Sequence, residues 1–470
     1  MYKIKLLFIF IFLLLSGLHS KDIIHTYTVS ISKDLNTLYV KAHFGESDFY
    51  YLYAGSKAAA RYTQNMHFIE DAYTIYKPQY EELSLNKNAA GRTLSYIFDI
   101  RSSIGRERWT STRKVGDDVV IPVDLWLWRP LSLKENEHIE VYFDFPPGIN
   151  FSSPWKRVAK NRYRIYPTPL DWPSATAFGT FVVDTVRIKN CVLSVVFMDG
   201  SYKTTQKELK EWLTGAARSV CQVYDSFPVD NVQILVFPGR PGREPVPFGM
   251  VIRGGGITVN FYIDPSRPLT EFIADWTATH ELSHCLLPMT DRNDAWFSEG
   301  LATYYQYILM GRDGRLDEQQ TWQRIYNGFQ KGIRGSKGMT LQNTAEKMRQ
   351  MRAYRYVYWS GAAIFLKADV ALRKTGGAQK SLDSVLKRVR QSLLPLHRSW
   401  SGREMMETMD SLAQTRIFAD MYEEHMHSDE FPVDENYWAQ LGVEINDGQV
   451  TLNDKAPLAH IRKNLLKNVY

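Results

Sequence analysis

Two patterns of hydrophobic and polar positions divide the chain near residue 200. Before that point, apolar and polar residues alternate over short segments, as at 25–31, 38–44 and 138–143, which is typical of β-strands with one buried face. Many short strands at this spacing favour a sandwich or a large sheet. Beyond that point, an amphipathic helix is expected at 206–223, and 315–425 reads as largely helical. We therefore expect an α+β protein.

The region between these patterns combines buried strands with helices. Strands are expected at 232–237 and 257–263, and helices at about 269–287, ended by Pro288, and at about 295–310, with Asp294 as N-cap. The expected units are a β-sandwich-like N-terminal domain (21–190), a central domain (191–312) and a helical C-terminal domain (313–470).

Composition narrows the function classes. The chain has 470 residues, 57 basic and 51 acidic, and a net charge of +6, with 23% charged residues. These values are those of a globular protein and exclude collagen, coiled coil and wholesale disorder. The mild positive charge and the lack of a long Lys/Arg run argue against nucleic acid as a partner.

Residues 1–20 predict export. Lys3 and Lys5 precede an unbroken apolar run, and small residues lead to a cut after Ser20, as in a secretory signal peptide. An uncleaved anchor is the alternative, and no later stretch predicts a membrane span. We expect a secreted or periplasmic protein, in which Cys191 and Cys221 either pair or remain buried free thiols.

The segment His280-Glu281-Leu282-Ser283-His284 has the spacing of a zinc site. Residues four apart in a helix lie about 40° apart around the axis, so both imidazoles can reach one ion. Glu281 emerges about 100° from His280, where a carboxylate can take a proton from water at the metal without being a ligand. The alternative is a helix with chance histidines.

A carboxylate in the next helix is the candidate third ligand. Glu299 stands in the first turns of that helix, and an antiparallel return can carry it to the same ion. The alternative is a surface carboxylate stabilised by the helix dipole, and Asp291 and Asp294 are the next candidate ligands. Thr303, one turn further, is a candidate support for one histidine. We expect one zinc ion per chain.

The two motifs together resemble a known family. H-E-x-x-H followed by the run from Trp296 to Tyr305 (Trp-Phe-Ser-Glu-Gly-Leu-Ala-Thr-Tyr-Tyr) is similar to the gluzincin metallopeptidases, and most similar to the glycyl aminopeptidase family, relatives of the aminopeptidase N family. Residues 145–155, 223–230 and 358–383 support this resemblance. It implies a β-rich N-terminal domain, a thermolysin-like zinc domain and a helical C-terminal domain, with His280, His284 and Glu299 as ligands.

The resemblance also implies a role for Tyr358 and shows departures. Tyr358 stands where relatives keep a tyrosine that hydrogen-bonds the tetrahedral intermediate; Tyr354 and Tyr356 are alternatives, and a packing role is another. Ser360 replaces the Lys of the family's Y-x-K-G-A pattern, the loop between His284 and Glu299 is shorter than usual, and we expect no PDZ-like module.

The most consequential departure concerns the substrate's amino terminus. Relatives bind it with the Glu of G-x-M-E-N, but the matching stretch here is Gly249-Met250-Val251-Ile252-Arg253, with Ile252 at that place. Arg253 favours an anionic substrate group if it faces the cleft, and is otherwise a solvated strand residue. The run Gly254-Gly255-Gly256 permits close approach of an extended peptide.

These observations predict an exported zinc metallopeptidase acting on a peptide or protein substrate. Glu281 is the expected general base and Tyr358 the expected oxyanion partner. Arg253 and the three glycines are the candidate substrate-binding residues. Alternatives are an aminopeptidase that uses an acid from elsewhere in the fold, a zinc hydrolase acting on another bond, and a non-catalytic scaffold that keeps the zinc.

Overall fold

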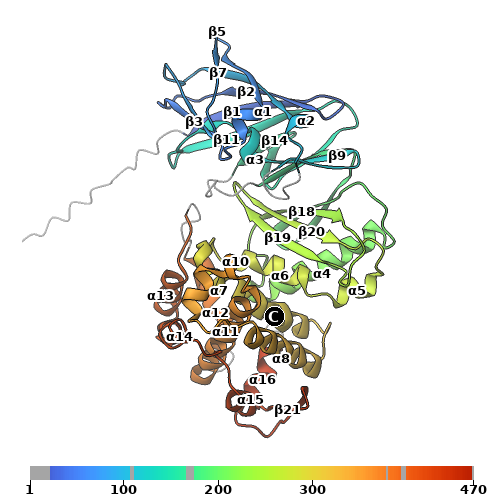
Figure 1. Cartoon of the computed structure of the whole chain (residues 1–470), viewed down its shortest axis with the longest axis vertical. Coiled ribbons are helices and arrows are strands. Elements are labelled where there is room, and N and C mark those ends of the chain that lie inside the picture. Colours follow the sequence, from blue (N-terminus) through green and yellow to red (C-terminus); the bar gives the residue numbers. More distant parts are fainter. Residues whose placement is uncertain (1–21, 106–110, 166–173, 377–378, 393–397, 468–470) are drawn as a thin grey trace, which may run out of the picture.

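The computed structural model describes residues 22–105, 111–165, 174–376, 379–392 and 398–467; the predicted signal peptide at 1–20 lies outside these ranges. Three parts follow one another along the long axis of the molecule: a β-rich part, a central sheet with helices, and a helical part (Figure 1). This arrangement agrees with the expected α+β class and with the change of pattern near residue 200.

The N-terminal part is built on an eight-stranded sheet. β1 pairs with β11 in parallel and the other neighbours are antiparallel. In spatial order the strands are β13 (Lys156–Ala159), β14 (Arg162–Ile165), β11 (Glu137–Asp144), β1 (Ile23–Ile31), β2 (Thr37–His43), β7 (Thr93–Asp99), β4 (Thr63–Phe68) and β5 (Asp71–Tyr76). The alternating side chains place one face of this sheet in a core that includes Trp126 and Trp128.

Smaller elements complete this part. They are the three-stranded sheet β10 (Arg129–Pro130), β3 (Tyr51–Tyr53) and β6 (Glu82–Ser84), the four-stranded sheet β12 (Asn150–Ser152), β15 (Ala175–Gly179), β9 (Asp118–Pro122) and β8 (Arg113–Val115), and the helices α1 (Ala59–Tyr62), α2 (Ile100–Ser103) and α3 (Val123–Trp126). A small apolar cluster, with Val120 and Ala177 on one side and Leu235 on the other, joins the four-stranded sheet to the central sheet.

The central sheet has five strands. In spatial order they are β16 (Val183–Ile188), β17 (Cys191–Phe197), β18 (Asn231–Pro238), β20 (Ile257–Ile263) and β19 (Phe248–Arg253). β17, β18 and β20 run parallel, whereas β16 and β19 are antiparallel edge strands. β16 therefore belongs to this sheet and not, as the boundary at 190 implied, to the N-terminal domain. A strand's local pattern does not say which sheet it joins.

Helices α4 (Gln206–Tyr224) and α6 (Thr277–Ser283) contribute to the core on one face of the central sheet. The single helix predicted at 269–287 is instead broken into α5 (Leu269–Ala274), α6 and the 3₁₀ turn η1 (His284–Leu286). The break is at Asp275, whose backbone is extended and whose carboxylate accepts a hydrogen bond from the Thr277 amide at 2.7 Å. That local bond competes with helix continuation, which explains the wrong prediction.

Two long helices form the centre of the helical part. α7 (Ala295–Arg312), which follows the 3₁₀ turn η2 (Arg292–Asp294), packs closely along α11 (Tyr354–Gly376). A Cβ on Gly300 would lie 2.6 Å from the Cα of Gly361, so these glycines allow the two backbones to approach. Asp294 stands at the N-cap, but its carboxylate accepts from the Trp296 indole and the Gly402 amide, each at 2.9 Å, and caps no amide of α7.

The remaining helices pack around this pair. They are α8 (Glu318–Arg334), α9 (Leu341–Glu346), α10 (Met348–Met351), α12 (Leu382–Gln391), α13 (Gly402–Ala413), α14 (Ile417–His425), α15 (Glu435–Leu441) and α16 (Ala459–Leu465), with the hairpin β21 (Val443–Asn446) and β22 (Gln449–Leu452). One continuous core joins them to the central sheet. No helix in the described ranges is long and apolar enough to cross a bilayer.

Candidate metal centre and active site

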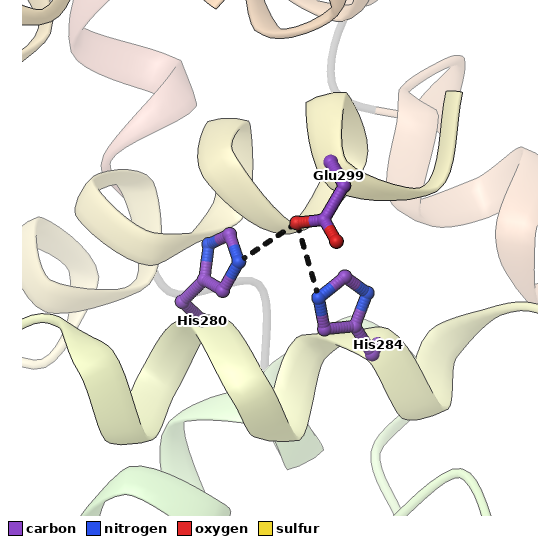
Figure 2. Close-up of side chains that lie close together, drawn as sticks. All are labelled: His280, His284 and Glu299. Atoms are coloured by element: carbon purple, nitrogen blue, oxygen red, sulfur yellow. Dashed lines mark hydrogen bonds and ion pairs between the residues drawn. The ribbon is translucent and has the colours of Figure 1, made fainter. Parts of the chain in front are cut away.

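Helices α6 and α7 bring His280, His284 and Glu299 together (Figure 2). One carboxylate oxygen of Glu299, Oε2, lies 3.2 Å from Nε2 of His280 and 3.5 Å from Nε2 of His284. One ligand atom of each residue lies within 4.8 Å of the ligand atoms of the other two. Among the described residues, these three form the group of side chains that could hold a metal ion. A catalytic zinc site is typically formed by three protein ligands that leave a further coordination position open, and two imidazoles with one carboxylate are such a set. The residues present therefore fit a zinc ion.

Each ligand comes from a helical segment, with His280 buried and His284 and Glu299 partly buried. His284 begins the 3₁₀ turn with helical backbone angles, so the break at Asp275 leaves the one-turn spacing of the two histidines intact. Glu299 lies one turn into α7, on the side of that helix that faces α6, and α7 packs against α6. The short loop between the two helices therefore suffices to carry Glu299 to the histidines.

The residue that orients His280 is Gln306. Its side-chain oxygen lies 2.9 Å from Nδ1 of His280, which leaves Nε2 of that ring directed at the metal position. Thr303, the predicted support, is buried on the same helix and makes no such contact with a ligand. Gln306 lies seven residues after Glu299, which places it two turns further along the same helix face. Helical periodicity was therefore sufficient to identify Gln306 as a neighbour of the metal ligands.

The electrostatics of the cluster favour a carboxylate anion at Glu299. Burial opposes its charge, but the two histidines hold the pKa of the Glu299 carboxyl well below its usual range. Burial likewise opposes a charge on His280, yet its hydrogen bond to Glu299 raises the pKa of this imidazole. A divalent ion at this position would replace the histidine protons as the partner of the Glu299 charge.

Glu281 lies under the edge strand β19. Burial raises the pKa of its carboxyl, against the attraction of His280 and His284, and the nearby backbone of Val251 partly offsets this rise. A Cβ on Gly249 would lie 2.6 Å from Cγ of Glu281, so the strand passes this side chain at a distance that only glycine permits. The carboxylate is thus held between the helix and the strand.

Tyr358 is the one of the three candidate tyrosines that reaches this cluster. Burial and the negative charges of the nearby Glu299 and Glu281 raise the pKa of its phenol. Tyr356 instead points its hydroxyl at the carbonyl oxygen of Asp429, 3.3 Å away, and Tyr354 is 41% exposed. The phenol of Tyr358 can therefore donate to a negative oxygen that forms beside the metal position.

The candidate substrate-binding residues lie at the end of β19. Arg253 donates to the carbonyl oxygen of Leu287 at 3.0 Å and to that of His284, so its guanidinium contacts the end of the H-E-x-x-H segment. Gly254, Gly255 and Gly256 form the turn into β20, with a positive φ at Gly255, and a Cβ on Gly256 would lie 2.5 Å from the carbonyl oxygen of Pro154. This contact gives Gly256 a packing role that the sequence analysis did not anticipate.

Ile252 lies on the other face of the central sheet. Gly249 and Arg253 meet α6, so alternation along the strand turns Ile252 toward the face that also carries Thr258 and Gln233. The residue at this level that faces α6 is Val251, which is also uncharged. No residue of β19 is a carboxylate.

The three cysteines are free and buried, so the unpaired alternative is the one found. Cys285 directly follows His284, and burial raises the pKa of its thiol to about 11. Asp291 and Asp294, the other candidate third ligands, stand outside the cluster of His280, His284 and Glu299. Glu299 is the carboxylate that the fold brings to the histidines.

The chain resembles known proteins in its fold. No family model matches the chain, and no curated protein matches it. Among solved structures, an aminopeptidase N family protein from Idiomarina loihiensis is 12% identical, with a TM-score of 0.66 over 90% of this chain and 79% of that one.

Two further solved structures share the fold. An M1 zinc metallopeptidase from Deinococcus radiodurans is 13% identical, with a TM-score of 0.56 over 88% of this chain and 96% of that one. A mutant of that enzyme has been solved with a bound Tyr-Ser-Ala substrate. Yeast LTA4 hydrolase in complex with bestatin is 12% identical, with a TM-score of 0.56 over 90% and 70% of the two chains. The chain therefore has the fold of the aminopeptidase N family of zinc metallopeptidases, and the expected fold class is confirmed.

Proposed function

We propose that this protein is a zinc metallopeptidase that hydrolyses peptide bonds. The observation that carries the proposal is the convergence of ligand atoms of His280, His284 and Glu299 within 4.8 Å, with Glu281 and Tyr358 close enough to interact with the charges of this cluster. Solved proteins of this fold are described as zinc metallopeptidases, and one was solved with a tripeptide substrate, which supports the same chemistry.

His280, His284 and Glu299 would hold the ion. Bound there, zinc supplies Lewis acidity at the substrate carbonyl and lowers the pKa of a water molecule at its open position. Gln306 keeps the His280 ring in the orientation that presents Nε2. Glu281, whose pKa is raised by burial, takes the proton from the attacking water and later delivers it to the leaving amine.

Tyr358 and β19 complete the proposed site. The phenol of Tyr358 donates a hydrogen bond to the carbonyl oxygen as negative charge develops on it, and its closeness to the charge of Glu299 supports this role. Among the described strands β19 pairs with a neighbour on one side only, and its other edge is where an extended peptide would pair. Pairing through the backbone does not depend on side chains, so it would orient peptides of many different sequences across the zinc ligands.

The proposal extends to substrate range and location. The missing carboxylate on β19 favours a peptidase without a strict demand for a free amino terminus, whereas an acid elsewhere would make it an aminopeptidase. The leader-like segment at 1–20 favours export to a periplasmic or extracellular compartment.

The deciding experiment compares wild type with Glu281→Gln. We expect one zinc per chain in both proteins, and a fall in peptide hydrolysis of at least about a hundredfold in the variant, because the base is lost and no ligand is. A non-catalytic scaffold would hold zinc without turnover in the wild type. A Glu281→Gln variant that retains more than a tenth of the activity would remove Glu281 from the mechanism.

A further inference from the structure

Three alternate residues of β19 meet the H-E-x-x-H segment. Gly249 packs against Cγ of Glu281, the backbone of Val251 lies near the Glu281 carboxylate, and the guanidinium of Arg253 donates to the backbone carbonyls of His284 and Leu287. Their spacing of two is that of side chains on one face of a strand. The strand therefore follows the helix from the proposed base to the second ligand.

The contact made by Arg253 is specific. Its two terminal nitrogens donate to the carbonyl oxygens of His284 and Leu287, which stand at the two ends of the turn after α6. The last carbonyls of a helix have no intrahelical donor, and α6 is only seven residues long. A planar guanidinium can bridge two such oxygens at once, and its positive charge suits the negative end of the helix dipole.

Arg253 is also partly buried, and within the described residues no carboxylate forms an ion pair with it. An ordinary arginine at a helix end reaches into solvent and stabilises the helix only weakly. Arg253 differs because one of the two carbonyls belongs to a proposed metal ligand. Moving that carbonyl moves the Cα of His284, and with it the imidazole.

We propose that Arg253 is a positioning residue for the metal centre, which fixes the backbone of His284 from the adjacent substrate strand. The inference rests on the proposed function, because it requires His284 to be a ligand. Partners that orient ligands from outside the coordination shell change metal affinity by about 10- to 100-fold when they are removed. Arg253 contacts the main chain of His284, whereas Gln306 contacts a ring nitrogen of His280.

The test measures zinc dissociation constants by competition with a chromophoric chelator. Arg253→Met keeps the length of the side chain and removes its donors, and we expect the zinc Kd to rise about tenfold or more. Arg253→Lys, which reaches one carbonyl at a time, should give an intermediate Kd. Arg315→Met is the control, because Arg315 also contacts this helix, through Thr279 Oγ1 at 3.0 Å, but touches no ligand; its Kd should match wild type.

Melting temperatures of the zinc-free proteins separate metal positioning from stability. A zinc Kd for Arg253→Met within twofold of wild type overturns the inference, and so does an equal rise in Arg315→Met. If Arg253→Met does not fold, Arg253→Lys and Arg253→Gln supply the same comparison. A wild-type protein that binds no zinc overturns the proposed function itself, which distinguishes the two failures.

Discussion

Replacing Gly249 with alanine adds one methyl group between the edge strand and the proposed base. A Cβ at this position would lie 2.6 Å from Cγ and 2.8 Å from Oε1 of Glu281, and 2.9 Å from Cγ2 of Thr277. Carbon atoms pack at about 3.5–4.0 Å, so Cγ of Glu281 must move by about 0.9 Å or more. Gly249 is not among the residues with positive φ, and the effect is therefore steric alone.

This displacement has two different consequences. A shift of about 1 Å in a catalytic group can lower the rate about a hundredfold, whereas overpacking of this kind costs about 1–3 kcal/mol of stability. The atoms nearest to a Cβ on Gly249 belong to Glu281 and Thr277 and not to a proposed ligand, so zinc content should stay at one per chain. We therefore expect Gly249→Ala to remain folded and zinc-loaded while kcat falls by about two orders of magnitude.

The assay is steady-state hydrolysis of a peptide, with zinc content and melting temperature measured on the same samples. Gly215→Ala, in α4, is the matched control: a Cβ on Gly215 would meet nothing within 4 Å, so this variant should keep full activity and gain about 0.5–1 kcal/mol of stability. Turnover by Gly249→Ala at more than half the wild-type rate would refute the reasoning that the strand holds the base in place.

Three further expectations concern the ligand, the oxyanion partner and the substrate. Glu299→Ala should lose zinc together with activity, because two histidines hold the ion poorly; unchanged metal content would mean another third ligand. Tyr358→Phe should lower kcat about a hundredfold with little change in KM. Tyr356→Phe should stay active, because the hydroxyl of Tyr356 donates to the carbonyl oxygen of Asp429; the opposite result would assign the oxyanion role to Tyr356. With no carboxylate on β19, acetylating a peptide's amino terminus should change kcat/KM by less than about tenfold, and strict trimming of free amino termini would contradict this.

Local sequence determined the parts of this protein that depend on near neighbours. The one-turn spacing of His280 and His284 follows from helical geometry, and it survives although the predicted long helix is broken before it. The hairpin at 443–452 follows from Asp447 and Gly448, which both adopt positive φ in the turn, as such a tight turn requires. These features need only the residues beside them.

Tertiary structure decided which distant groups meet. The sequence places Gln306 and Thr303 on one helix, but the packing of α7 against α6 selects Gln306 as the partner of His280. The pairing of β19 with β20 turns Ile252 away from α6 and brings Arg253 onto the end of the H-E-x-x-H segment. Such contacts depend on strand register and on helix packing, and these are fixed by burial of the whole core and not by the propensities of the residues that make the contact.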